Sequence, residues 1–217
     1  MGRFSKDADV LRVDSAVFAE AMGLPVLCKG DGGVIAGTRF TASGANFTAA
    51  GVAAGQVIWL RSGDGKVDGA FEITARVSAT ELTVSVIRGN DAAAAVGPGD
   101  ATAVSFRVPT LEARGEDAAY FLTQYFGIRP GFADAELGEE QIITDDPLRP
   151  AEVYAILADV YSSRAVAVGE TAEWDKADYF RRMYERARQR CRLWLDGGED
   201  GQGDTAIDGG SLRLHRE

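Results

Sequence analysis

The chain has 217 residues, of which 46% are hydrophobic and 26% charged, and its formal net charge at pH 7 is −10. This acidity argues against general nucleic-acid binding, which requires clustered basic residues, and no apolar run is long enough for a membrane span. A single histidine, His215, excludes histidine-based triads and histidine-rich zinc sites. Two distant cysteines, Cys28 and Cys191, predict a reducing compartment rather than a disulfide framework.

The first predicted element is a helix from about Val10 to Ala21. Gly23 can end it in a left-handed conformation, and Pro25 cannot continue it. Residues 1–29 are therefore predicted to contribute one helix to a helical domain.

Residues 30–108 are rich in Gly, Thr, Val and Ala, with turn signals at short intervals, which is typical of several short antiparallel strands. In "ELTVSVIR", Leu82 and Val84 alternate with polar residues, as expected of a strand with one buried face. "AFEITARV" alternates in the same way, and "QVIWLRS" reads as a more central strand. The region is predicted to be a small sandwich or barrel, and "GNDAAAAVGPGDATA" within it to be a long flexible loop. The glycines of "CKGDGGVIAG" lack the spacing of a phosphate-binding loop.

Residues 109–195 are predicted to form a helical bundle. One helix follows Pro109, with Thr110 as a candidate N-cap, and another opens at Pro150. The predicted apolar stripe of the first helix consists of Ala118, Phe121, Leu122 and Tyr125. The segment between these helices carries the acidic pairs Glu139–Glu140 and Asp145–Asp146, which are predicted to be solvated rather than catalytic.

The last helix gives the clearest pattern. Its apolar positions recur every three or four residues from Ala177, at Phe180, Tyr184, Ala187, Cys191 and Trp194. All the arginines lie outside this stripe, so the helix is predicted to present a cationic surface, at Arg181, Arg182, Arg186, Arg188, Arg190 and Arg192. Residues 176–195 carry a net charge of +5 and residues 109–175 one of −10, so the complement of this surface is expected within the chain or across a subunit boundary.

Residues 196–217 are predicted to form an extended C-terminal arm that contacts a partner. The candidate interface residues are Trp194 and, near the chain end, Leu212, Arg213, Leu214, His215 and Arg216. Four aspartates recur in the arm, but their spacing does not match a calcium-binding loop, so no metal, cofactor or catalytic site is predicted. The three tryptophans are expected to fill cores, with Trp174 as an alternative interface anchor.

These regions together predict an α+β protein. It would consist of a small bundle of about four helices, an inserted all-β sandwich or barrel, and the extended C-terminal arm.

Residues 149–217 resemble the C-terminal part of tailed-bacteriophage head–tail connector proteins, also called adaptors or neck proteins. The matching residues are Lys176, Tyr179, Tyr184, Glu185, Ala187 and Asp196, followed by the terminal "SLRLHRE". The strands of the β module are also similar to small β modules of virion proteins. Simple adaptors are mostly a small helical bundle, and this chain departs from them by a β insertion of about 80 residues.

The resemblance implies a structural virion protein rather than an enzyme, assembled in the host cytoplasm and placed in the neck between capsid and tail. It would form a homo-oligomeric ring, commonly of twelve copies, under the portal protein. The ring would extend the DNA channel, let DNA pass without specific binding, and dock the next neck or tail protein. Two alternatives stay open: another neck protein, such as a head-closure or tail-proximal ring protein, and a cytosolic hydrolase or carbohydrate-binding module. The last would need carboxylates, with Glu139 and Glu140 as its best candidates.

Overall fold

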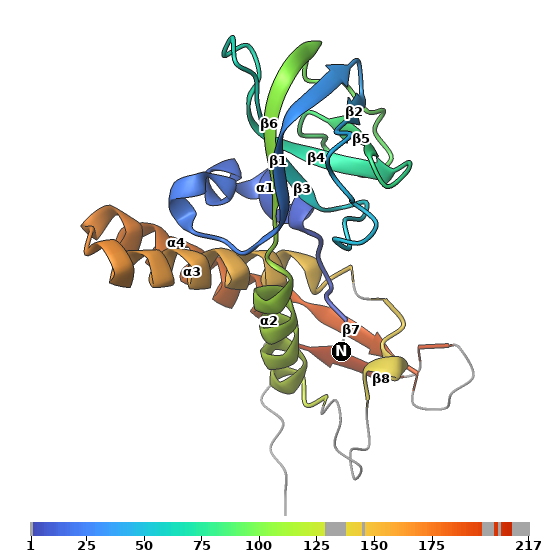
Figure 1. The fold of residues 1–217 in the computed structure, drawn as a ribbon. Helices are drawn as coiled ribbons and strands as arrows, with labels where there is room; N and C mark the ends of the chain where they lie inside the picture. The colour runs from blue at the N-terminus through green and yellow to red at the C-terminus, as the bar shows by residue number, and fades with distance from the viewer. Residues whose placement is uncertain (1, 129–137, 145, 197–201, 204, 210–217) are drawn as a thin grey trace, which may run out of the picture. The chain divides into compact units, whose positions relative to one another are not determined.

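A computed structural model describes residues 2–128, 138–144, 146–196, 202–203 and 205–209 of the chain. The chain divides into two compact units (Figure 1). The helical unit comprises Met1–Ser5 and Glu112–Glu217, and the barrel unit comprises Lys6–Leu111. The barrel unit is thus an insertion into the helical unit, a few residues after the N-terminus.

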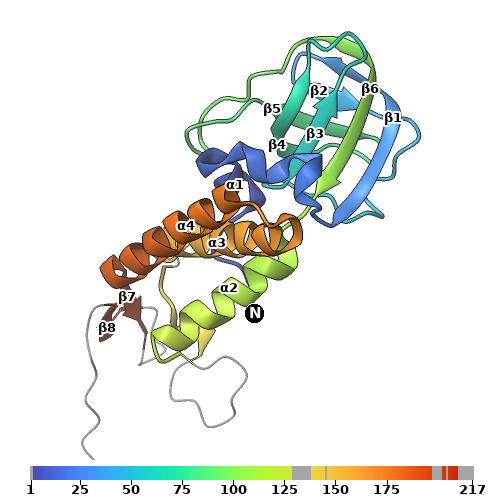
Figure 2. The ribbon, with the colours of Figure 1, turned by 90° about the vertical axis from the view of Figure 1, so that its left-hand side faces the viewer.

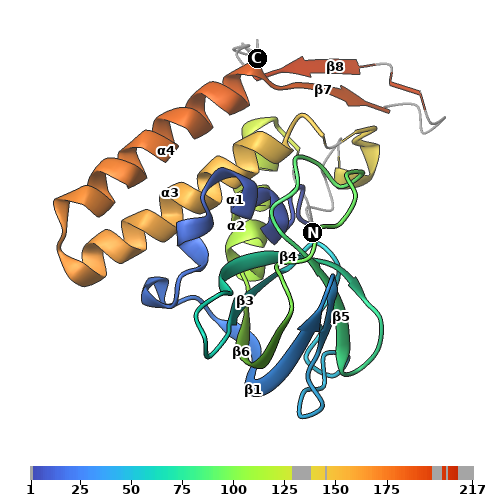
Figure 3. The ribbon, with the colours of Figure 1, turned by 90° about the horizontal axis from the view of Figure 1, so that it is seen from above.

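Six strands of the barrel unit close into one antiparallel barrel with the neighbour order β1-β2-β5-β4-β3-β6. Figure 2 labels all of these strands, and Figure 3 shows the barrel from above. They are β1 (Val26–Ala36), β2 (Arg39–Thr41), β3 (Val57–Arg61), β4 (Asp68–Arg76), β5 (Glu81–Ser85) and β6 (Ala101–Pro109). The strands expected from period-2 alternation are present, and Leu82 and Val84 of β5 are fully buried. Closure leaves no open sheet edge, so every strand has a hydrogen-bonded neighbour on both sides.

The barrel interior is filled by aromatic and branched side chains. Phe40, Phe47 and Phe106 form its centre, with ring centroids 5.4 to 6.2 Å apart. Such tilted and edge-on pairs are the favoured arrangement of aromatic rings in a core. The barrel unit therefore has a hydrophobic core of its own.

The longest strand, β1, was not identified by the sequence analysis. It runs through the glycine-rich stretch 30–33, where its register with β6 shifts twice. A Cβ atom on Gly33 would lie 2.5 Å from Cε2 of Phe40, so only glycine fits beside that ring. The glycines here allow a strand to bend closely over an aromatic core, which is a structural use rather than a phosphate-binding one.

The predicted helix at 10–21 is wrong in extent and in place. The chain forms α1 (Asp7–Val13) and then two short 3₁₀ turns, Ser15–Phe18 and Glu20–Met22. Asp14 breaks the helix because it adopts an extended conformation and its side chain accepts a hydrogen bond from the Ala16 N–H. These elements belong to the barrel unit, not to the helical one.

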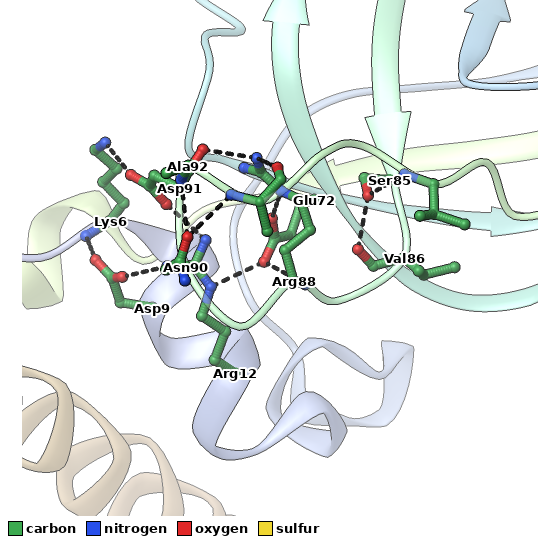
Figure 4. Close-up of polar contacts among 12 residues, drawn as sticks. Lys6, Asp9, Arg12, Glu72, Ser85, Val86, Arg88, Asn90, Asp91 and Ala92 are labelled. Atoms are coloured by element: carbon green, nitrogen blue, oxygen red, sulfur yellow. Dashed lines mark hydrogen bonds and ion pairs between the residues drawn. The ribbon is translucent and has the colours of Figure 1, made fainter.

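The β5–β6 connection, predicted as a flexible loop, is tied down by a charge network (Figure 4). The fully buried carboxylate of Glu72 on β4 pairs with Arg12 of α1 at 2.9 Å and with Arg88 of the loop at 2.7 Å. Asp91 of the loop pairs with Lys6 at 2.8 Å and with Arg12 at 2.6 Å. Lys6 and Arg12 hold the pKa of Asp91 down to about 2, so its carboxylate stays charged at a lower pH than an ordinary aspartate does.

The helical unit contains three long helices and a two-stranded sheet within its described residues (Figure 2). They are α2 (Glu112–Tyr125), a 3₁₀ turn at Glu139–Gln141, α3 (Arg149–Val168), α4 (Thr171–Arg190), β7 (Arg192–Leu195) and β8 (Thr205–Asp208). Helix α3 packs against both α2 and α4. Gly169 ends α3 in the left-handed conformation, with φ of 72°, and α4 returns antiparallel along it.

The N-terminal residues are anchored to the helical unit by a buried carboxylate. Glu152 of α3 is fully buried; it accepts a hydrogen bond from the Phe4 N–H at 2.7 Å and lies 3.5 Å from Nε of Arg3. Burial raises the pKa of Glu152 to about 7, because the loss of solvent outweighs the charge of Arg3 and the hydrogen bonds from Phe4 and Ser5.

The predicted fold class is therefore wrong. The β module is a closed six-stranded barrel that carries the first helix itself, and the other helices form a layer completed by a small sheet rather than a four-helix bundle. The predicted last helix ends at Arg190, because Cys191 turns to an extended conformation. The middle of the predicted arm contains β8, which pairs with β7. Residues 197–201, 204 and 210–217 of that arm lie outside the described residues.

Candidate interface on the helical unit

Helix α4 buries a narrow stripe and leaves most of its surface in solvent. Ala177 and Phe180 are buried, and the Phe180 ring stacks on Tyr161 of α3 at 5.7 Å between centroids. Tyr184 and Ala187 continue the stripe, where they are half-buried against the core of the unit. The predicted stripe is thus present up to Cys191 and places the arginines on the other sides of the helix.

Three of the predicted arginines form a row on the exposed side of α4. Arg182, Arg186 and Arg190 follow one another at four-residue spacing and are all exposed. Within the described part of the chain, none of them has an ion-pair partner. Like charges four residues apart on a helix repel each other, so this cationic row costs free energy in the isolated chain. We refer to these three residues as the arginine row.

Two other arginines of the helix are used within the chain. Arg181 pairs with Asp178 at 2.7 Å. The guanidinium of Arg188 lies over the rings of Tyr125 and Tyr184, at 4.4 and 4.9 Å from their centroids. Cation–π contacts of this kind fix the side chain in place, so Arg188 serves packing rather than an outer surface.

The remaining described candidates, Arg192 and Trp194, are on a strand. Residues 192–195 alternate exposed and buried, which is the period of β7 and not of a helix. Arg192 lies over the Trp194 ring at 5.2 Å and 3.6 Å from Asp208 of β8. The other candidates, Leu212, Arg213, Leu214, His215 and Arg216, lie outside the described residues.

An acidic surface lies on α2, within the region 109–175 whose negative charge was expected to complement the arginines, although its individual residues were not predicted. Glu116 and Asp117 are exposed and have no ion-pair partner among the residues described, and Phe121, one turn further, is 64% exposed. We refer to these three residues as the acidic face. The stripe predicted for this helix was wrong at Phe121 and Tyr125, because the helix instead buries Gly115, Ala119 and Leu122 and leads into the buried Phe126. The spacing of four, three and four residues in that set was the available signal.

The exposed tryptophans also differ from expectation. Trp174 and Trp194 are 43% and 42% exposed, and Trp59 of the barrel is half-buried, so none of the three fills a core. Together with Tyr179, which is 52% exposed, Trp174 adds apolar surface to the cationic side of α4. Large aromatic side chains beside unpaired arginines are the composition enriched at the centres of protein interfaces.

Of the two acidic pairs, Glu139, Glu140 and Asp146 are among the described residues, and Asp145 lies outside them. Glu139 accepts a hydrogen bond from the Gly2 N–H at 3.1 Å, and Glu140 is exposed on the same 3₁₀ turn. No group of three or more His, Cys, Asp or Glu side chains is arranged to hold a metal ion among the residues searched, which are the described ones.

In comparisons with known proteins, no family model, no curated protein and no solved structure matches the chain. Among the described helices, none is both long and apolar enough to cross a membrane.

Proposed function

We propose that this protein is a structural subunit of a tailed-bacteriophage neck, a head–tail connector that forms a homo-oligomeric ring under the portal protein. The observation that carries the proposal is the pair of complementary, unpaired surfaces on the helical unit, the arginine row of α4 and the acidic face of α2. The resemblance of residues 149–217 to connector proteins supports the same function.

The position of these surfaces favours head-to-tail association. They lie on two different helices that pack on the same central helix, α3. When one copy offers its acidic face to the arginine row of the next, the pair still has one free surface of each sign. Repeated addition then closes a ring if the rotation between copies permits. Pairing across copies also relieves the repulsion within the arginine row.

The net negative charge of the chain agrees with the proposed role in a DNA channel. In the proposed neck, DNA passes through the ring without specific binding. A chain with a net charge of −10 gains little from phosphate contacts and therefore does not retain DNA. The portal protein and a downstream neck or tail protein are the proposed partners on the two sides of the ring.

A charge-exchange experiment tests the ring contact. One variant carries Arg182→Glu and Arg186→Glu, and a second carries Glu116→Arg and Asp117→Arg. Each variant alone places like charges at the proposed contact and is expected to stay monomeric in conditions where the unmodified protein forms assemblies larger than a dimer. An equimolar mixture restores opposite charges at every contact and is expected to assemble, as measured by mass photometry and negative-stain electron microscopy at low ionic strength.

The control is Lys66→Glu, which reverses a side chain that is 78% exposed in the barrel unit. It should assemble like the unmodified protein. A protein that stays monomeric at all concentrations, with and without a portal ring, would contradict the proposal. So would a tight dimer that is insensitive to salt and to both sets of charge changes.

A further inference from the structure

A hollow on the outside of the barrel unit has a lining that the proposed function does not use. Its volume is about 860 Å³, and its walls come from the 3₁₀ turn at Glu20–Met22 with the residue before it, and from β1, β3 and β6. A volume of this size is in the range of small-molecule sites. All of the lining residues belong to the barrel unit.

The floor of the hollow is a row of side chains across three neighbouring strands. Arg107 of β6 is paired in register with Lys29 of β1 on one side and with Trp59 of β3 on the other. Directly paired residues of antiparallel strands point to the same face. Phe106 and Val108, which flank Arg107 along the strand, point into the barrel core, so this row points outward.

Two cations opposite each other are an unfavourable cross-strand pair. Neither Lys29 nor Arg107 has an ion-pair partner, in a unit whose residues are all described. Arg107 is held in place by a hydrogen bond to the Phe18 carbonyl and by its position over the Trp59 ring, 5.2 Å from the centroid. A bound anion would pair with both Lys29 and Arg107 and so remove their mutual repulsion. The fixed guanidinium of Arg107 would hold that anion in one position.

The electrostatics of Arg107 agree with this geometry. Burial is the main cause that lowers its pKa; the charge of Arg61 acts in the same direction, and that of Glu20 opposes it. An ion pair between Arg107 and a bound anion would offset the free-energy cost of removing the guanidinium from solvent.

The other walls restrict which anion fits. Trp59 is half-buried and offers an aromatic surface, while Glu20 and Asp31 line the hollow with carboxylates. A long phosphodiester strand would meet these carboxylates with further negative charge. A ligand with one anionic end, one planar ring and several hydrogen-bond donors would satisfy all three kinds of wall.

We propose that this hollow binds a free nucleotide, with its phosphate at Lys29 and Arg107, its base against Trp59, and its hydroxyl or amino donors at Glu20 and Asp31. The arrangement uses a point charge and a planar guanidinium for the phosphate and an aromatic ring for the base. This inference is independent of the ring contact, which lies on the other unit of the chain.

Isothermal titration calorimetry of the full chain with AMP, GMP, CMP and UMP tests the proposal, with inorganic phosphate, adenosine and a ten-residue oligothymidylate as comparison ligands. At least one mononucleotide should bind with one site per chain, and at least tenfold more tightly than phosphate or the nucleoside alone, because each part contributes separate contacts. Lys29→Ala should weaken nucleotide binding by about tenfold, the effect of one charge-assisted hydrogen bond.

Lys66→Ala, a change to an exposed cation of the same unit outside the hollow, is the matched control and should bind like the unmodified protein. Arg107→Gln is expected to abolish binding; if this variant fails to fold, the exposed Lys29 decides the question alone. The proposal is overturned if no mononucleotide binds, if Lys29→Ala has no effect, or if phosphate alone binds equally well. It is also overturned if the oligothymidylate binds more tightly than every mononucleotide, which would indicate a strand-binding surface.

Discussion

The Glu72 network of the barrel unit and the exposed surfaces of the helical unit differ in whether their charged side chains are paired. In the barrel unit, the carboxylate of Glu72 is fully buried and paired with two guanidiniums, and the resulting network fixes a connection that is rich in alanine and glycine. In the helical unit, the arginine row and the acidic face remain in solvent without partners in the described residues. The buried Glu72 network thus holds one connection of the barrel unit in place, while the exposed charged surfaces of the helical unit are available for association.

The largest expected effect comes from breaking the buried network. Glu72→Gln removes the negative charge shared by Arg12 and Arg88, which are only 16% and 13% exposed. Arg88 would lose its carboxylate partner, and Arg12 would keep only Asp9 and Asp91. Leaving a mostly buried guanidinium unpaired should lower the free energy of unfolding of the barrel unit by about 3–5 kcal/mol. Urea unfolding followed by circular dichroism measures this loss.

The control for that variant is Glu81→Gln. Glu81 pairs with Arg39, whose side chain is 63% exposed, so its loss should cost about 1 kcal/mol or less. Equal losses in the two variants would mean that the buried network contributes no more than a surface ion pair.

The next effect concerns pH and the helical unit. The pKa of Glu152 is about 7 in the folded chain, above the ordinary value of 4.5. The folded state therefore binds more protons than the unfolded state between these values, and stability should fall by about 3 kcal/mol as pH rises from 4.5 to 7. Urea unfolding at a series of pH values measures the slope.

Glu152→Gln isolates this contribution, because glutamine does not titrate. The variant should lose the part of the pH dependence that lies between 4.5 and 7, whereas Glu140→Gln, at an exposed position, should retain it. Identical pH profiles for Glu152→Gln and the unmodified chain would rule out the raised pKa as the cause.

A smaller effect tests the close packing of β1 in the barrel. In Gly33→Ala, the added methyl group would overlap the Phe40 ring, so the barrel must shift at a cost of about 1–3 kcal/mol. Gly44→Ala is the matched change, since nothing lies within 4 Å of a Cβ at that position. Thermal unfolding should separate the two variants by several degrees, and coincident melting curves would contradict the close approach.

The smallest effect on stability should come from the surface that we assign to assembly. Arg182→Ala with Arg186→Ala removes two exposed side chains without partners, so the free energy of unfolding should change by less than about 0.5 kcal/mol. The same variant should weaken ring assembly. A loss of several kcal/mol in the monomer would mean that the row is structural, and the contrast between the two units would no longer hold.

In the barrel unit, part of the fold could be predicted from the sequence and part could not. Elements with a strict period were identified, such as β5, where Leu82 and Val84 alternate with polar residues. The closed barrel could not be distinguished from a sandwich, because alternation gives the faces of a strand and not the order of its neighbours. Strand β1 was missed because its glycines carry no side chain that reports a face, and their purpose is visible only beside Phe40.

Errors at the ends of elements have local causes. Strand β7 was predicted as the end of the preceding helix. Cys191 and Trp194 continue the helical spacing of three or four residues, and this hid the alternation of exposed and buried residues over 192–195. The candidate interface was predicted in part: the sequence analysis named the arginines and the acidic region 109–175 as their complement, but not Glu116, Asp117 and Phe121 as the residues that form the acidic face. Burial of Leu122 rather than Phe121 depends on where α3 packs, and that is a tertiary property.

The connectivity of the barrel unit has a consequence for how such a chain could arise. Both ends of the unit are close together, since the Leu111 N–H donates to the Asp7 carboxylate at 3.4 Å. A segment whose entry and exit points adjoin can be gained or removed as a single genetic cassette, because its host needs only a short bridge between the residues on either side. A shortened chain that joins Ser5 to Glu112 through a few glycines would thus show whether the helical unit folds without the barrel unit.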